Sequence, residues 1–211
     1  MNQSRIYTKL GDDGSTGLLF GGRTSKADPL MDVIGSIDET VATLGLARAA
    51  SRDALLSAAI LGVQRDLFVA GADLVANPHA RARLLPGISL VTPGMVSRLE
   101  TLIDQRVARR PLRPVFVVPG ANLVSAALDM ARTQVRRAER RLVRHALQGQ
   151  QAQQAQPAQP AQPAQQGQVP HAPNPQVGIY LNRVSDLLYV LARQAAGDDE
   201  EPVSHDAAPA A

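Results

Sequence analysis

The sequence predicts an all-α protein, a bundle of five helices preceded by an irregular N-terminal loop. Alanine and leucine supply most of the apolar side chains, whereas aromatic residues make up only 3% of the chain and tryptophan is absent. A β-sandwich would need more aromatic and β-branched residues. Five segments have helical patterns, and most of the connections between them are short. The 211 residues are enough for one domain with a sizeable core.

The first three predicted helices occupy residues 30–51, 54–76 and 93–109. The first places apolar side chains at helical spacing, and the second is apolar on most sides, which is typical of a buried helix. The third begins after Thr92, whose hydroxyl can cap a helix, and has Pro93 in its first turn.

The last two predicted helices occupy residues 122–147 and 175–196, and Gly197 ends the second of them. Before the fourth helix, residues 113–121 form a short apolar and extended segment that ends at Pro119-Gly120.

Residues 1–196 are predicted to form one domain, with an insertion at 148–174 and a tail at 197–211. The Gln-Pro-Ala units of the insertion have nothing to bury, so we expect a disordered, partly polyproline-II loop. A tract that docks a partner is the alternative. The acidic tail is also expected to be disordered.

Composition limits the classes of function. Cysteine is absent, so there are no disulfides and no thiolate metal site. The N-terminus lacks the apolar run of a signal peptide, and no segment is expected to approach the length of a membrane span. We therefore expect a cytoplasmic protein. The net charge is only +3, but arginines concentrate at 132–144, which favours a particular anionic ligand over general polyanion binding.

The N-terminal loop is unusually rich in glycine, with five of them between residues 7 and 23. Clustered glycines allow consecutive backbone N–H groups to form a concave nest for an anion, and Lys9 and Lys26 add positive charge. The spacing is not that of a Walker A loop. A glycine-rich turn or a short hairpin is an equally good interpretation of this segment alone.

The fourth helix carries a cationic stripe. Arg132, Arg136, Glu139 and Arg140 share one helical face, beside an apolar stripe that would pack in the core. A solvent-exposed basic helix is the simplest alternative. A nucleic-acid patch is also open, but no aromatic residues interleave with the arginines and the whole-chain charge is modest.

Two further polar features lie beside apolar stripes. Asn182, Asp186, Tyr189 and Arg193 fall on one face of the last helix, which indicates an interface, a ligand or surface hydrogen bonding. Asp38-Glu39 interrupts an otherwise apolar helix, and an acid at that depth would need a cationic partner or an inter-subunit contact.

Five motifs occur in order along the chain: YTKLGDDGSTGLLFGGR with a later lysine, GSIDE, FVVPG, ARTQVRRAER and YLNRVSDLLYVLAR. With these motifs the chain resembles the PduO-type ATP:corrinoid adenosyltransferases. The resemblance covers nearly the whole chain except the insertion and the tail.

The resemblance implies a ferritin-like five-helix bundle that forms a homotrimer, with active sites between neighbouring subunits. It implies transfer of the 5′-deoxyadenosyl group of ATP to the Co(I) of a corrinoid such as cobalamin, with release of triphosphate. It also implies Mg²⁺ with the ATP, a reductase that supplies electrons, and an adenosylcobalamin-dependent enzyme as a recipient. Neither nucleic acid nor a membrane is an expected partner.

The resemblance also implies roles for individual residues. The expected catalytic residues are Asp38, Phe116, Arg132 and Arg136, with Arg132 paired to Asp38 across the subunit boundary and Phe116 crowding the lower face of the corrinoid. The expected ATP-binding residues are Thr8, Lys9, Gly11, Asp13, Gly14, Ser15, Thr16, Gly17, Lys26, Arg136, Arg137, Glu139, Arg140 and Asn182. Phe116, Asp129 and Asp186 are expected on the corrinoid side, and Glu139 is the candidate for holding Mg²⁺.

Two positions depart from the family pattern. Asp13 stands where many members have lysine, and it adds negative charge beside a phosphate site or helps to hold Mg²⁺. Asp129 stands where members commonly have histidine, and it could pair with an arginine one turn further along the helix.

Two rival functions stay open at this point. A regulator or cofactor-delivery protein on the same scaffold would bind ATP and corrinoid without adenosyl transfer. A basic helical nucleic-acid binder would show affinity that falls steeply with salt and no preference for ATP.

Overall fold

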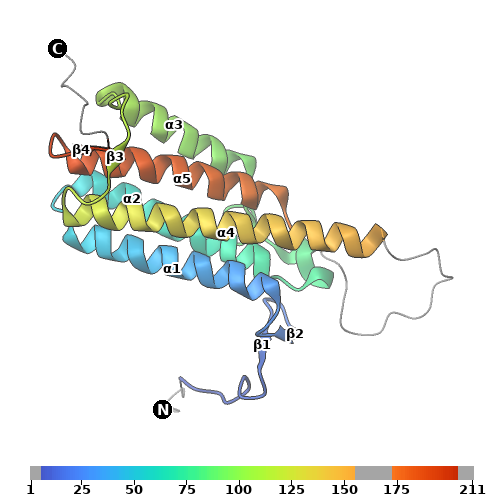
Figure 1. The fold of residues 1–211 in the computed structure, drawn as a ribbon. Coiled ribbons are helices and arrows are strands. Elements are labelled where there is room, and N and C mark those ends of the chain that lie inside the picture. The colour runs from blue at the N-terminus through green and yellow to red at the C-terminus, as the bar shows by residue number, and fades with distance from the viewer. Residues whose placement is uncertain (1–5, 155–172, 204–211) are drawn as a thin grey trace.

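The computed structural model describes residues 6–154 and 173–203. Its helices are α1 (Pro29–Ala50), α2 (Ala54–Val75), α3 (Pro93–Arg109), α4 (Leu123–Gln154) and α5 (Pro175–Ala196), with a 3₁₀ helix at Pro78–Arg83. The five long helices lie side by side as a bundle, and the N-terminal loop projects from one end of α1 (Figure 1). The all-α bundle that the sequence predicts is therefore confirmed.

The helix boundaries follow from capping side chains. Asp28, Asp53, Thr92 and Asn174 each accept a hydrogen bond from a backbone N–H in the first turn of the helix that follows. At the other end of α5, Gly197 has φ of 72°, a left-handed conformation that glycine adopts without strain. The predicted start of α3 at Thr92 and end of α5 at Gly197 are both confirmed.

The core lies between α1, α2, α4 and α5, and α3 packs on the outside of α5. The apolar stripe of α4 is fully or almost fully buried, as its spacing predicts. Tyr180 of α5 is also buried, and its hydroxyl donates to Asp66 over 3.1 Å. Burial and the Asp66 carboxylate together raise the pKa of Tyr180, so its hydroxyl stays a hydrogen-bond donor.

The expectation that no segment approaches the length of a membrane span is wrong. By its length and composition alone, α2 could cross a membrane. A single such helix is weak evidence for a membrane protein, since a core helix passes the same test. One side of α2 contributes Ile60, Leu67 and Leu74 to the core of the bundle.

A buried carboxylate joins four segments at one end of the bundle. Asp73 of α2 pairs with Arg81 over 2.5 Å, and it accepts hydrogen bonds from the backbone N–H of Val91 and from the side-chain amide of Asn174. Asp73 is completely buried, so these partners satisfy a carboxylate that would otherwise be costly to remove from water. The start of α5 is thereby tied to the end of α2.

Two predicted boundaries of disorder are wrong. Helix α4 continues to Gln154, seven residues into the segment from 148 to 174 that was expected to be disordered, whereas residues 155–172 lie outside the described part of the chain. The start of the tail is also ordered, because β4 (Glu201–Pro202) pairs antiparallel with β3 (Val117–Val118). Residues 204–211 lie outside the described part.

Candidate functional site

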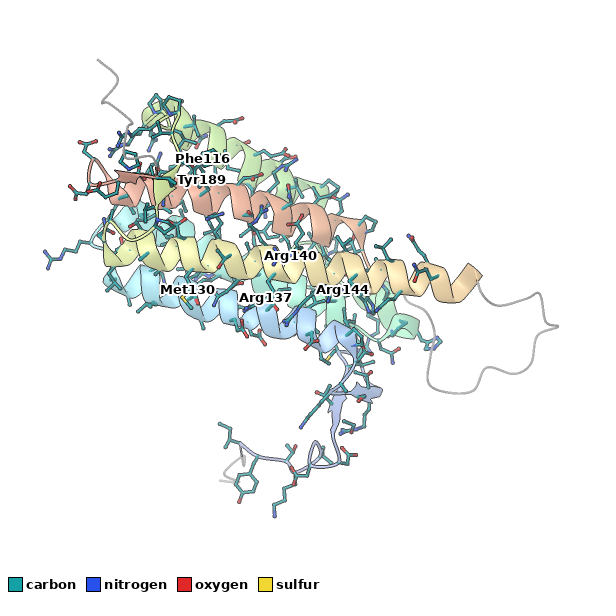
Figure 2. The ribbon with its side chains drawn as sticks, in the orientation of Figure 1. Phe116, Met130, Arg137, Arg140, Arg144 and Tyr189 are labelled. Atoms are coloured by element: carbon teal, nitrogen blue, oxygen red, sulfur yellow. The ribbon has the colours of Figure 1, made fainter. Side chains whose placement is uncertain are left out.

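The arginines of α4 point toward two different neighbours. Arg132 and Arg136 line a hollow beside α5 and α3. Arg137 instead forms an ion pair with Glu39 of α1, and Arg141 donates to the hydroxyl of Ser36 over 2.5 Å. Figure 2 shows Arg137, Arg140 and Arg144 along this helix. The arginines of α4 are therefore divided between the hollow and the contact with α1.

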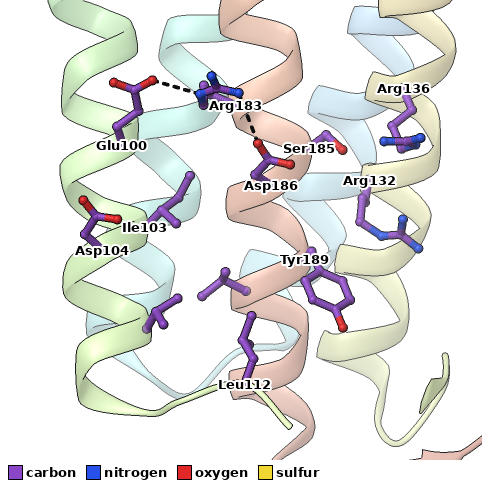
Figure 3. A pocket seen from close by; sticks show the side chains of 12 residues that line it. Glu100, Ile103, Asp104, Leu112, Arg132, Arg136, Arg183, Ser185, Asp186 and Tyr189 are labelled. Atoms are coloured by element: carbon purple, nitrogen blue, oxygen red, sulfur yellow. Dashed lines mark hydrogen bonds and ion pairs between the residues drawn. The ribbon is translucent and has the colours of Figure 1, made fainter. Parts of the chain in front are cut away.

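The hollow between α3, α4 and α5 has a volume of about 550 Å³. Arg132 and Arg136 form its α4 wall, and Asp186 and Tyr189 come from α5 (Figure 3). Arg183 of α5 crosses toward α3, where it donates to Glu100 over 2.9 Å. Three of the residues expected at the site, Arg132, Arg136 and Asp186, thus line the same cavity.

Charges of both signs line this hollow, but they are not equally available. Arg183 is neutralised by Glu100 and by Asp186, with the latter 3.4 Å away. The hydrogen bond to Glu100 is the main reason that the pKa of Arg183 is raised. Arg136 is exposed and makes no hydrogen bond or ion pair with another described residue. Its guanidinium is the group on this wall best placed to receive an anion.

Asn182 and Glu139 meet across the contact of α4 with α5. The side-chain amide of Asn182 donates to Glu139 over 3.0 Å, and its oxygen accepts from Arg183 over 2.7 Å. Asn182 of the last helix thus reaches Glu139 of α4, and its expected part in the nucleotide site stays a prediction.

Asp129 forms the expected pair with an arginine one turn on, since Arg132 donates to it over 3.2 Å. Asp129 also pairs with Arg193, which is 7% exposed. The guanidiniums of Arg132 and Arg193 lie 5.9 Å and 5.4 Å from the centre of the Tyr189 ring, within the range of cation–π attraction. Arg193 is thus a buried structural ion, not the ligand-facing side chain that its helical face suggests.

The N-terminal loop folds into a hairpin. Strand β1 (Ser15–Gly17) pairs with β2 (Arg23–Ser25). Arg23 donates to the hydroxyl of Ser15 over 2.9 Å, and the ammonium of Lys26 donates to the carbonyl of Gly11 over 2.7 Å. Of the two interpretations of this segment, the short hairpin is confirmed, and the anion nest stays a prediction.

Asp13 belongs to the same set of local contacts. Its carboxylate accepts from the hydroxyl of Ser15 over 2.7 Å and from the Ser15 backbone N–H over 2.9 Å. Both hydrogen bonds lower the pKa of Asp13, and the one from the hydroxyl has the larger effect. Lys9 and Gly14 both have positive φ, which turns the chain sharply on either side of Gly11.

The part of the loop before β1 extends away from the bundle (Figure 1), whereas Leu19 and Gly21 are hydrogen-bonded to Val75 and Asn77 at the end of α2. Within the described chain, no hydrogen bond or ion pair joins residues 6–17 to α4. Thr8 and Lys9 are exposed, as are the apolar side chains of Ile6, Tyr7 and Leu10. The expected nucleotide residues of the loop and of α4 are therefore not assembled within one chain.

Asp38 and Phe116 are both exposed. Asp38 lies on the outer side of α1, so the expectation of a deeply placed acid is wrong, although partial burial raises the pKa of its carboxyl. Phe116 is 86% exposed on the connection between α3 and α4. An aromatic ring so exposed buries its surface only when something binds over it.

No group of three His, Cys, Asp or Glu side chains that could hold a metal ion occurs among residues 6–154 and 173–203. Mg²⁺ bound with a nucleotide does not need such a cluster, because it keeps several waters and uses one or two carboxylates plus phosphate oxygens. The half-buried carboxylate of Glu139 fits that limited role.

The exposed Arg136, which makes no hydrogen bond or ion pair with another described residue, and the glycine-rich start of the N-terminal loop are features typical of an anion-binding protein. The comparisons with known proteins agree. The sequence model of cobalamin adenosyltransferases matches residues 6–195, and the chain belongs to this family.

Individual relatives extend this result. A corrinoid adenosyltransferase from Mycobacterium tuberculosis is 36% identical over 203 residues, which cover 93% of this chain and 91% of the relative. One from Citrobacter freundii is 40% identical over 139 residues, or 66% of this chain and 77% of the relative. A PduO-type ATP:corrinoid adenosyltransferase variant from Lactobacillus reuteri, solved with cobalamin and ATP, is 28% identical with a TM-score of 0.70, covering 91% and 93% of the two chains.

Sequence reasoning missed three features of the site. The link between Arg183 and Glu100 joins helices 83 positions apart, so no local pattern signals it. Tyr189 was placed on the polar face of the last helix but given no role. The third missed feature is the ion pair of Asp186 with Arg183. The spacing of these two residues, three apart on a helix, is the signal that could have predicted it.

Proposed function

We propose that this protein is an ATP:corrinoid adenosyltransferase. The Co(I) centre of the substrate uses its electron pair to attack C5′ of ATP, the cobalt–carbon bond forms, and the C5′–O5′ bond breaks. The bonding pair leaves with the triphosphate, and the cobalt is formally oxidised to Co(III). The observation that carries this proposal is the exposed Arg136 on the wall of a 550 Å³ hollow, in a chain of this family.

Such a displacement needs no covalent nucleophile or general base from the protein. The protein must hold the cobalt and the carbon in line, which is catalysis by proximity. It must also stabilise the charge that develops on the leaving triphosphate, and arginine and lysine suit this role. Arg136 and Arg140 are the exposed cations of α4 placed for it, with Arg137 next to them.

The nucleotide is proposed to lie between α4 and the N-terminal loop. The loop contributes backbone N–H groups around Gly11 and Gly14, the hydroxyls of Thr8, Ser15 and Thr16, and the ammonium groups of two lysines. Lys26 would exchange its contact with the carbonyl of Gly11 for a phosphate. Mg²⁺, when bound, neutralises phosphate charge, and Glu139 is the carboxylate proposed to hold it.

A homotrimer with shared sites explains why the loop and α4 are separate in one chain. Ile6, Tyr7 and Leu10 are exposed on the loop, and a neighbouring subunit would cover them. Asp38 on α1 would meet Arg132 of the next subunit, a head-to-tail contact of the kind that closes into a ring. Partial burial raises the pKa of Asp38, and no described residue forms an ion pair with its carboxyl, so a cation from a neighbouring subunit would stabilise it.

The corrinoid is proposed to lie against Phe116. An apolar ring at the lower face of the corrin would exclude an axial ligand. Because that ligand stabilises Co(II) and not Co(I), its loss makes Co(II) easier to reduce, and axial ligation is a known control on metal potentials. A one-electron reductase would supply the electron, and an adenosylcobalamin-dependent enzyme would receive the product.

The remaining expectations complete this picture. Residues 1–196 would act as one adenosyltransferase domain, with the insertion dispensable for activity. ATP is an intracellular substrate, so we place the enzyme in the cytoplasm.

The direct test is an absorbance assay for adenosylated corrinoid formed from ATP and chemically reduced Co(I) corrinoid. We expect the product band to appear only when ATP and Co(I) are both present, with one triphosphate released per product. Tight binding of ATP and corrinoid without product would instead support a regulator on the same scaffold.

A further inference from the structure

We propose that Glu200 is a positioning residue that holds β4 against the segment carrying Phe116, and so fixes where this aromatic side chain stands. The inference rests on the corrinoid function proposed above. Glu200 lies beyond residues 6–195, which the family model matches, and within the tail that the sequence predicted to be disordered.

The C-terminal segment folds back onto the Phe116 segment. Gly197 turns the chain, β4 pairs with β3, and the backbone N–H of Val203 donates to the carbonyl of Phe116 over 2.9 Å. Because the Phe116 side chain is 86% exposed, packing does not fix its position. The backbone contacts with β4 are therefore the main restraint on where the ring can stand.

Glu200 is what anchors this segment to the bundle. Its carboxylate is buried, with the residue 7% exposed, and one of its oxygens lies 3.2 Å from Nε of Arg193. That distance fits an ion pair, although neither atom has a hydrogen bond of suitable geometry with a described residue. The attraction is thus one of charge. Arg113 adds a hydrogen bond to the Glu200 carbonyl over 3.3 Å, and Arg110 pairs with Asp198 at the surface.

The same ions reach the wall of the hollow. Arg193 pairs with Asp129 as well as with Glu200, and Asp129 accepts from Arg132. A buried charge is stable only when it is paired. The network Arg132–Asp129–Arg193–Glu200 therefore connects the cationic wall to β4 and, through β4, to Phe116. If Glu200 is neutralised, Arg193 keeps its ion pair with Asp129 but loses the one with Glu200. The segment that contains β4 is therefore the part that would be less firmly held.

The test compares Glu200→Gln with the unmodified full-length protein, and Asp199→Asn serves as the matched control because Asp199 is exposed in the same turn. Adenosylation is measured from chemically prepared Co(I) corrinoid and from Co(II) corrinoid with a one-electron reductant. We expect Glu200→Gln to slow the Co(II) reaction about tenfold and the Co(I) reaction by less than about twofold, since a small misplacement affects the step that depends on the ring. The control should match the unmodified protein in both.

A second variant tests the same idea without changing a charge. Val203→Pro removes the N–H group that bonds the Phe116 carbonyl. The same split between the two reactions is expected, and this variant carries the test if Glu200→Gln does not fold. The spectrum of bound Co(II) corrinoid should also shift in both variants toward that of the form with its lower axial ligand in place.

Equal slowing of both reactions, or no slowing of either, would overturn the positioning role. Combination with Phe116→Ala is the sharper check, because a residue that acts through Phe116 adds nothing once the ring is gone. Additive losses in the double variant would contradict the inference. Failure of the unmodified protein to adenosylate Co(I) corrinoid would refute the proposed function itself. The ratio of the Co(II) and Co(I) rates tests only the positioning role of Glu200.

Discussion

Polar groups in the helical bundle and in the N-terminal loop are held in different ways. In the bundle, hydrogen bonds join residues distant in sequence, such as Asn174 to Asp73, 101 positions apart, and Asn182 to Glu139, 43 apart. In the loop, Ser15 bonds to Asp13 and Lys26 to Gly11, over two and fifteen positions. The bundle is thus held by contacts between helices. The loop is tied to the end of α2 at Leu19 and Gly21, but its part before β2 depends on local contacts and on what binds it.

The largest effect is expected on the bundle side, for Arg136→Ala. This change removes an exposed cation, unpaired among the described residues, from the proposed triphosphate site. Loss of one charged contact to the transition state costs on the order of 3 kcal/mol, or about a hundredfold in kcat/KM. Steady-state kinetics with ATP and Co(I) corrinoid measure it.

The matched control for Arg136→Ala is Arg65→Ala, which removes an exposed arginine from α2. We expect kcat/KM to be unchanged in this control, and the melting temperature to be similar in both variants. Near-normal kinetics for Arg136→Ala would remove the cationic wall from the mechanism.

A change at Asp73 should affect stability more than catalysis. Asp73→Asn leaves Arg81 without its ionic partner, while the amide keeps the size of the side chain. We expect a loss of about 2 kcal/mol in the free energy of unfolding, less than for a fully buried pair because Arg81 is partly exposed. Thermal denaturation followed by circular dichroism measures the loss, with Asp12→Asn in the exposed loop as control. An unchanged melting temperature would show that the other contacts of the four joined segments are sufficient.

The sequence predicts the bundle well because its signals are local. Helical spacing of apolar residues, the cap at Thr92 and the stop at Gly197 depend on near neighbours, and the helices begin and end close to where those signals stand. The burial of Arg193 and Glu200 depends instead on contacts between α4, α5 and the tail, so composition alone made the tail look disordered.

The candidate site shows the same limit. Spacing predicts that Arg132 and Arg136 share a face, and they do line one hollow. Spacing does not say that Arg137 faces Glu39, nor that Asp38 is exposed, because both depend on which helix packs beside which. For the loop, glycine content predicts a turning backbone, but it does not distinguish hydroxyls that bind a ligand from hydroxyls that bind one another.

On the loop side, Gly14→Ala should have a smaller and more local effect. Gly14 has φ of 82°, and a Cβ there would meet no atom within 4 Å, so the effect is backbone strain alone. Strain of about 1 kcal/mol should raise the KM for ATP roughly fivefold and leave the melting temperature of the bundle unchanged. Gly87→Ala is the matched control, with φ of 72° and an equally open Cβ position far along the chain. A rise in KM in both variants would show that the effect is not specific to the loop.

The smallest effect is expected for Ser15→Ala, which tests whether the order of the loop is local. The Ser15 hydroxyl is the main cause of the lowered pKa of Asp13, so its removal should raise that pKa toward the ordinary value of an aspartate. A lowered pKa in the folded state means that the ionised carboxylate stabilises the hairpin above the ordinary pKa, and that this contribution is lost as the pH falls through the lowered value. NMR titration of the Asp13 carboxyl measures the change, and Ser15→Thr, which keeps a hydroxyl, should preserve the low pKa. If Asp13 titrates as before in Ser15→Ala, the Ser15 hydroxyl is not what lowers its pKa, and the Ser15 backbone N–H and Arg23 account for the shift instead.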